Sequence, residues 1–251
     1  MSKALNAFMT RTSQLAAHVA AIRDTLLLGR GDFFRDFLEA SADMFLRPPR
    51  PDTAAADLLR PWRAAAASTG LEHDPCFRHV SITWSKEAPT LTLAGGRAAV
   101  VPVLAAARAS ELCWNGVRAH YTPPWPLPLL LRPDALDVYS ALFSYFLTVE
   151  RAARALDDTW AHLQTQRRVS RRRACEPAVA AEWALHQRMA HFVRHVQTYL
   201  KQDVAQRAFA AFDERVEDAQ TFVQVRAVAG IVSVQTLRKP MMAALSGPRA
   251  P

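Results

Sequence analysis

The longest regular pattern of apolar residues in this chain runs over residues 133–163. Its apolar positions recur every three or four residues, at Tyr139, Leu142, Phe146, Val149, Ala153, Leu156, Trp160 and Leu163. This spacing places all of them on one stripe of an α-helix of about eight turns. Pro133 suits the first turn of such a helix, and Asp134 places negative charge at the positive end of its dipole. The pattern predicts a helical bundle that buries the whole stripe, Trp160 included.

Helical spacing recurs before and after this stretch. Residues 2–28 predict a first helix, and residues 33–44 predict a second, which ends before Pro48 because proline disfavours the helical conformation of the residue preceding it. Asp52 or Thr53 can cap a third, alanine-rich helix, which we expect Pro61 to interrupt. The later helices are predicted to bury the following positions: Trp183, Met189, Phe192, Val196 and Tyr199 or Leu200 after Pro177; then Val204, Ala208, Phe212 and Val216; then Phe222, Val225, Ala229 and Val232.

A short turn over residues 29–32 joins the first two predicted helices. We expect Gly29 to adopt the left-handed conformation that closes a helix, and Asp32 to accept backbone N–H bonds at the start of the next one. Arg30 is then expected at an exposed corner. The Gly-Arg-Gly sequence is not a phosphate-binding loop, because it lacks both the glycine spacing and the Lys-Ser or Lys-Thr pair of such loops.

Two short segments depart from helical spacing. Residues 79–84 alternate and are rich in β-branched and aromatic side chains, and residues 117–121 are a candidate strand partner. Between them, residues 87–110 are rich in Pro, Gly and Ala without a clear period, which predicts an irregular surface insertion. The expected fold class is therefore all-α, a helical bundle with a small β patch and an irregular insertion.

Four prolines fall within residues 121–128 and leave Trp125 between Pro124 and Pro126. Each proline fixes φ and lacks an N–H donor, so this segment cannot continue a helix. The sequence predicts a stiff, extended segment, in which Trp125 either anchors the turn inside the bundle or faces a partner.

Composition excludes several classes of protein. The chain has 251 residues, 50% of them hydrophobic, which is enough for a sizeable core. It contains no uncharged apolar run of 18 residues, so we expect no membrane span. Three cysteines far apart do not suggest a disulfide framework. No catalytic motif is present, and His191 and His195, although four apart, have no Cys or carboxylate at ligand spacing. We therefore predict no enzymatic activity, no metal and no cofactor.

The formal net charge of +8 is concentrated in one run. Five arginines lie within residues 167–173, in an expected connection between helices. Like charges in a solvated loop account for such a run, whereas a phosphate-tracking surface usually spreads its cations along a face with aromatic residues between them. Nucleic-acid binding through this run is the less favoured alternative.

Three ordered blocks of this sequence resemble the C-terminal domain of the gamma-tubulin complex proteins, most closely the component-four type. The central block combines Tyr121, Trp125, Pro126 and Leu127 with a following helix that carries Tyr139, Leu142, Phe143, Tyr145, Phe146, Leu147, Leu156 and Trp160. The flanking blocks are residues 26–39 and residues 185–204. The resemblance covers roughly residues 20–230, and implies a helical domain over residues 1–230 followed by a divergent, irregular tail over residues 231–251 that lacks the last helices of the family.

The resemblance implies a gamma-tubulin-binding subunit that contributes to microtubule nucleation at a microtubule-organising centre, such as a centrosome or spindle pole. Its implied partners are gamma-tubulin and the other complex components, with no role for a membrane. We expect the partner-binding residues to be Arg30, Gly31 and Asp32 in the corner, Tyr121, Trp125 and Pro126 in the proline-rich segment, and Arg188 and Tyr199 on a later helix. A basic nucleic-acid-binding protein and a generic helical scaffold remain the alternatives.

Overall fold

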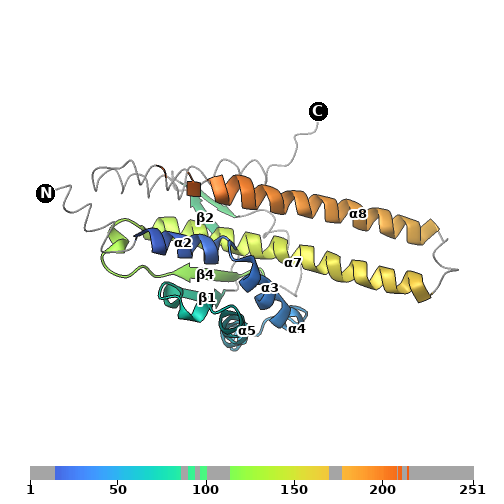
Figure 1. Cartoon of the computed structure of the whole chain (residues 1–251), viewed down its shortest axis with the longest axis horizontal. Helices are drawn as coiled ribbons and strands as arrows, with labels where there is room; N and C mark the ends of the chain where they lie inside the picture. The colour runs from blue at the N-terminus through green and yellow to red at the C-terminus, as the bar shows by residue number, and fades with distance from the viewer. Residues whose placement is uncertain are drawn as a thin grey trace.

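The computed structural model describes residues 15–85, 90–93, 97–100, 114–169, 177–207, 209–210 and 214. A body of short helices and a small sheet packs beside the first half of a long helical hairpin, and the tip of this hairpin extends beyond the body (Figure 1). The fold is mostly helical with a small β patch, as predicted. The main helices are α2 (Leu15–Leu26), α3 (Gly31–Ala40), α4 (Ala42–Phe45), α5 (Ala54–Ser68), α7 (Pro133–Val169) and α8 (Pro177–Thr198).

The predicted strand pair is confirmed. After two short 3₁₀ turns, η2 (Leu71–His73) and η3 (Phe77–His79), strand β1 (Val80–Trp84) pairs antiparallel with β4 (Val117–Tyr121). The prediction of an irregular insertion over residues 87–110 is wrong in part, because β2 (Thr90–Leu93) and β3 (Arg97–Val100) form an antiparallel hairpin there. The β-branched pattern of residues 90–93 is short, and alanines dilute it in residues 97–100, so the alternation was not visible in sequence. The other residues of this insertion lie outside the described part of the chain.

An aromatic cluster centred on Trp62 of α5 forms the middle of the core. Its ring contacts Phe33 at 4.7 Å and Phe37 at 5.4 Å between centroids, both edge to face, and stacks on Phe77 at 5.9 Å. Phe143 of α7 reaches the same ring at 6.4 Å. Edge-to-face and offset contacts at these distances are the favoured geometries of aromatic pairs. The cluster therefore joins α3, α5 and α7, which are far apart in sequence.

Pro61 does not interrupt α5, contrary to the sequence prediction. The helix runs without a break from Ala54 to Ser68, with Pro61 inside it and buried. Proline removes one backbone hydrogen bond of a helix, but buried Leu58 and Trp62 fix the turns on both sides. Tertiary packing holds the helix together where the local propensity disfavours it. Thr53 precedes the helix, although its side chain makes no capping hydrogen bond.

The turn between α2 and α3 has a different geometry from the one predicted. Leu28, and not Gly29, has the positive φ, at 54°. Burial of the Leu28 side chain compensates for a backbone conformation that is unfavourable for leucine. Gly29 is needed for close approach instead, because a Cβ atom there would lie 3.0 Å from the carbonyl oxygen of Arg23. Arg30 occupies the N-cap position of α3 and makes no side-chain capping hydrogen bond, whereas the Asp32 carboxylate accepts a backbone hydrogen bond from Phe33, as expected.

The long apolar stripe of α7 is fully buried only in its first half. Residues 139–147 are all buried, and Ser144 Oγ donates a hydrogen bond of 2.5 Å to the carbonyl of Val117 in β4. From Val149 onward the stripe is only half-buried, because this part of α7 leaves the body and packs mainly against α8. Trp160 lies in this second half against Trp183, at 4.7 Å between ring centroids. The prediction that Trp160 is a core residue is therefore wrong.

Helix α8 packs antiparallel to α7 through a face that agrees with the predicted one only in part: Trp183 and Val196 are half-buried and Leu200 is buried, as expected. The buried residues of its contact face are His186 and Ala190, and Leu200 continues this face beyond the end of the helix. Met189 and Phe192, which were expected to be buried, are 48% and 69% exposed. His186 occupies an inward position because its Nε2 donates to the carbonyl of Leu156 at 2.8 Å. His186 thus faces α7 with its Nε2 hydrogen-bonded and its buried Nδ1 without a partner among the described residues, and two large apolar side chains face outward.

The chain continues from α8 without the break expected before Val204. A π-helical segment, η7 (Tyr199–Gln206), extends the helix directly. At the other end of the hairpin, α7 continues to Val169, so the backbone of residues 167 and 168 is helical and does not belong to a connecting loop. The remaining arginines of the run, most of the helix expected from Val204 to Val216, the helix expected after it and the tail over residues 231–251 lie outside the described residues.

Candidate partner-binding surface

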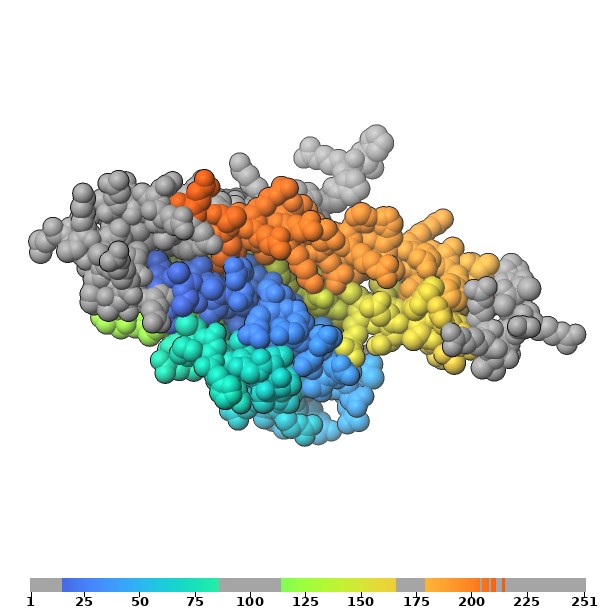
Figure 2. All heavy atoms as spheres, viewed as in Figure 1, coloured from blue at the N-terminus to red at the C-terminus, as the bar shows by residue number. Residues whose placement is uncertain are grey.

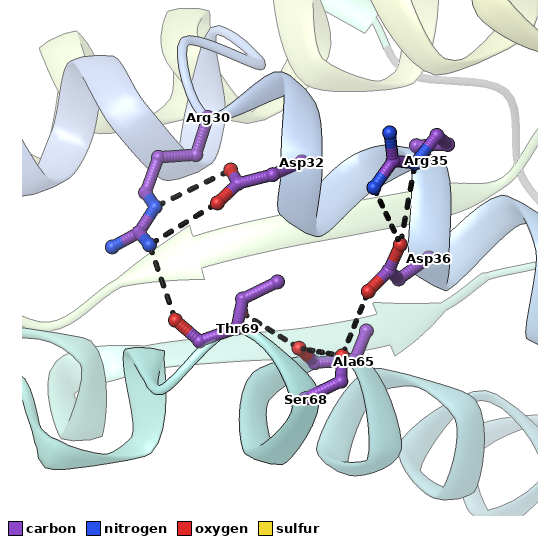
Figure 3. Close-up of polar contacts among 7 residues, drawn as sticks. All are labelled: Arg30, Asp32, Arg35, Asp36, Ala65, Ser68 and Thr69. Atoms are coloured by element: carbon purple, nitrogen blue, oxygen red, sulfur yellow. Dashed lines mark hydrogen bonds and ion pairs between the residues drawn. The ribbon is translucent and has the colours of Figure 1, made fainter.

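The corner formed by Arg30, Gly31 and Asp32 is held by hydrogen bonds to the end of α5 (Figure 3). Arg30 donates to Asp32 at 3.3 and 3.5 Å and to the carbonyl of Thr69 at 3.2 Å. The hydrogen bond from Arg30, followed by that from the backbone N–H of Phe33, lowers the pKa of the Asp32 carboxyl. Arg30 is therefore half-buried and engaged, whereas the sequence predicted an exposed corner.

A second polar link holds α3 and α5 together one turn further along (Figure 3). Ser68 Oγ donates to Asp36 at 2.9 Å, and Arg35 donates to the other oxygen of the same carboxylate at 3.4 Å. The two links fix the start of α3 against the end of α5. A partner that meets this corner would meet a preorganised surface, which lowers the entropic cost of binding.

Trp125 is presented to solvent by the segment between β4 and α7. Its side chain is 78% exposed, although the residues on both sides of the segment, Tyr121 and Leu127, are buried. The Leu127 amide donates to the carbonyl of Pro124 at 2.9 Å, which closes a tight turn around Trp125 and Pro126. Of the two alternatives for Trp125, the structure shows the outward-facing one. An exposed tryptophan on a turn anchored at both ends is a typical interface residue.

Tyr121 was predicted to contact a partner, but its side chain is buried in the core. Its hydroxyl hydrogen-bonds Nδ1 of His18, and its ring packs against His18 and His79, with centroids 6.1 and 6.2 Å away. Burial raises the pKa of the Tyr121 hydroxyl. Tyrosine was ambiguous in sequence because its ring favours burial while its hydroxyl suits an interface.

We expect the free energy of unfolding to decrease as the pH falls below about 6.5, the ordinary pKa of histidine. Burial lowers the pKa of both His18 and His79 in the folded chain, and the charge of Arg78 lowers both pKa values further. The neighbouring His79 also lowers the pKa of His18, whereas Asp74 raises it. Below pH 6.5 the unfolded chain therefore binds protons that the folded chain does not, which favours unfolding. Urea midpoints measured between pH 7.5 and 5.5 test this.

The matched variant for this prediction is His18→Gln, which removes one of the two imidazoles whose pKa is lowered and keeps a polar group. Its urea midpoint should depend less steeply on pH than that of the unsubstituted chain. Equal pH dependence of the two proteins would show that His18 does not contribute.

Arg188 lies beside a row of exposed apolar side chains on α8. Leu185 is 58% exposed, and with Met189 and Phe192 it forms a row at helical spacing. Tyr199 lies beyond this row in η7, where it is half-buried and packs against the core. An exposed apolar row next to an arginine is a typical composition of a protein interface. The sequence identified Arg188 but assigned Met189 and Phe192 to the core.

The structure does not gather the predicted residues into one small site. Trp125 precedes the N-terminal end of α7. Arg188 lies much further along the hairpin, because its neighbour in α8, His186, hydrogen-bonds the carbonyl of Leu156 in α7. At a rise of 1.5 Å per residue, these points are on the order of 30 Å apart along α7. The candidate surface therefore consists of separate zones: the corner, the Trp125 turn and the outer face of α8.

Catalytic and metal sites were not expected, and the described residues contain no group of three metal-ligating side chains. The rings of His191 and His195 lie 4.2 Å apart, but both side chains are exposed. No helix in the described part of the chain is long and apolar enough to cross a membrane.

Comparison with known proteins places this chain in a family. Residues 15–239 match the family model described as "Gamma tubulin complex component C-terminal". Because this match covers most of the sequence, the chain belongs to the gamma-tubulin complex component C-terminal family. It is 26% identical over 235 residues to gamma-tubulin complex component 4 of Arabidopsis thaliana, and 27% identical over 220 residues to the protein of that name from Homo sapiens. It is also 25% identical over 232 residues to component 2 of Mus musculus.

These relatives are much longer than the region that they share with this chain. The matches cover 85% and 87% of this chain, but only 31% and 32% of the Arabidopsis and human proteins. For the mouse component 2, the match covers 89% of this chain and 25% of that protein. The chain thus spans about a third or less of the length of these relatives. The component-four resemblance noted from the sequence is confirmed.

Proposed function

We propose that this chain binds gamma-tubulin as a subunit of a gamma-tubulin complex and contributes in this way to microtubule nucleation at microtubule-organising centres. The observation that carries the proposal is the match of residues 15–239 to the gamma-tubulin complex component C-terminal family. The names of the similar proteins add support, because each is a gamma-tubulin complex component. The other components of such a complex are further proposed partners.

The proposed contact surface consists of Arg30, Gly31 and Asp32 in the corner, Trp125 and Pro126 in the turn, and Arg188 and Tyr199 near the outer face of α8. Trp125 and Arg188 are exposed, and tryptophan and arginine are the residue types that most often dominate interface energetics. A standard interface buries roughly 800 Å² on each partner. Zones on the order of 30 Å apart suit contact with a large folded protein better than contact with a small molecule.

We expect the double variant Arg30→Glu, Arg188→Glu to lose gamma-tubulin binding in a pull-down while its circular dichroism spectrum stays that of a folded helical protein. Reversing charge at two contact residues introduces repulsion and leaves partner groups without their hydrogen bonds, which typically costs several kcal/mol. Since Arg30 also links α3 to α5, Trp125→Ala serves as a second variant. Its side chain is largely exposed, so truncation should weaken binding without unfolding the chain.

The matched control is Arg63→Glu, Arg78→Glu, which makes the same change in net charge at two exposed arginines outside the proposed zones. This control should bind like the unsubstituted chain. Unchanged binding by both the folded Arg30, Arg188 variant and Trp125→Ala would rule out the surface. If the unsubstituted chain does not bind gamma-tubulin but binds RNA with a steep salt dependence, nucleic-acid binding replaces the proposed function.

A further inference from the structure

A cleft of about 250 Å³ lies where α3, α7 and α8 meet. Figure 2 shows these helices, in blue, yellow and orange, meeting on one face of the molecule. Apolar side chains from all three helices contribute to its lining, among them Phe34, Leu156 and Val193. Four basic side chains also line it: Arg35 from α3, Arg154 from α7, Arg194 from α8 and Lys201 from η7.

The basic side chains of the cleft are only partly neutralised. Glu150 accepts hydrogen bonds from Lys201 at 2.7 Å and from Gln197 at 3.0 Å, so this carboxylate is already engaged. Within the described residues, Nε of Arg154 is buried and has no hydrogen-bond partner. Buried polar groups are nearly always satisfied in folded proteins, so an acceptor that enters the cleft beside Arg154 would supply the missing hydrogen bond.

We propose that this cleft binds an acidic segment of a protein partner, with one glutamate or aspartate carboxylate held between Arg154 and Arg194. Arginine binds carboxylates through strong, charge-assisted hydrogen bonds, and two guanidinium groups from different helices can grip one carboxylate from both sides. The apolar lining suits the methylene groups of the entering side chain. This inference does not rest on the proposed gamma-tubulin function, although Gly31 of the corner also lines the cleft.

The size and charge of the cleft favour a carboxylate over the phosphates of a nucleic acid. A volume near 250 Å³ is below the range of drug-sized ligand sites, and it suits one or two side chains. Glu150 and Asp157 also line the cleft, so its excess of positive charge is small. A nucleic-acid backbone instead requires a long row of cations, and usually aromatic faces on which bases stack. The aromatic residue of this cleft, Phe34, is buried in the core.

The test measures binding of a short fluorescein-labelled, glutamate-rich peptide to the full chain by fluorescence anisotropy. Arg194→Glu reverses one charge at an exposed position of the cleft, so the fold should be retained. We expect the peptide affinity to fall about tenfold or more in this variant. Arg63→Glu makes the same charge change on α5, away from the cleft, and should change the affinity by less than about twofold, because separated exposed charges are screened by salt.

A second variant and two further probes make the result specific. Arg154→Gln should also weaken peptide binding, since it removes the guanidinium with the unsatisfied Nε. A lysine-rich peptide of the same length should bind Arg194→Glu better than it binds the unsubstituted chain. Equal loss of affinity in Arg194→Glu and Arg63→Glu would overturn the proposal, because it would indicate general surface charge. Tighter binding of an RNA oligonucleotide of equal charge, sensitive to Arg194→Glu, would overturn it in favour of a phosphate site.

Discussion

Trp62→Ala is expected to lower the free energy of unfolding by roughly 3–5 kcal/mol. Trp62 is almost completely buried and contacts aromatic side chains of α3, of α7 and of the turn before β1. Its removal leaves a cavity where α3, α5, α7 and the turn before β1 meet. Urea denaturation monitored by circular dichroism measures the change.

The matched comparison is Trp160→Ala, which removes the same side chain from the projecting half of α7. Trp160 is half-buried, and its ring contacts are with Trp183 and His186 of α8. We therefore expect a loss of only roughly 1–2 kcal/mol. An equal or larger loss for Trp160 would contradict the division of α7 into a core half and a projecting half.

Gly116→Ala should destabilise the chain by roughly 3 kcal/mol or more. A Cβ atom on Gly116 would lie 1.7 Å from the carbonyl oxygen of Ser85, a backbone atom that cannot rotate away. The Ser85 amide donates to the carbonyl of Gly116 at 3.0 Å, so relief of the clash would break the link between the end of β1 and the start of β4. Thermal unfolding followed by circular dichroism measures the effect.

Gly31→Ala is the control for this substitution. A Cβ atom at Gly31 would have no heavy atom within 4 Å, and alanine favours a helix more than glycine does. We expect unchanged stability or a gain of roughly 0.5 kcal/mol. A Gly116→Ala protein as stable as Gly31→Ala would show that the strand ends can separate without cost.

Much of the local structure was predictable because the determining residues are close in sequence. The three- and four-residue spacing in α7 reports helix formation directly, and the alternation of β1 and the partner segment β4 identified the strand pair. The prolines around Trp125 predicted a stiff, extended, non-helical segment; the structure instead has a tight turn and a 3₁₀ helix, η5 (Leu127–Leu129). The hairpin of β2 and β3 escaped prediction because its strands are only four residues long.

The functional surface was only partly predictable. The resemblance identified the family, and the comparison confirmed it. The resemblance also indicated Trp125 and Tyr121 as contact residues. Trp125 is exposed in the structure, whereas Tyr121 hydrogen-bonds His18 in the core. The sequence spacing cannot distinguish these two aromatic residues, because their burial depends on contacts with residues that are far away in the chain. The cleft was missed for the same reason, since Arg35, Arg154 and Arg194 meet only after three helices pack.

The sequence by itself determined the helices, the strand pair, the proline-rich segment and the family, because these depend on periodicity, backbone restriction and ordered motifs. The tertiary structure decided which half of α7 is buried, which face of α8 contacts α7, and why Pro61 is tolerated within α5. It also assigned the positive φ to Leu28 instead of Gly29. The physical reason is common to these cases. A helix can have apolar residues on more than one face, or a residue that disfavours its backbone conformation, and burial against distant elements then determines which face is buried and whether the unfavourable residue is tolerated.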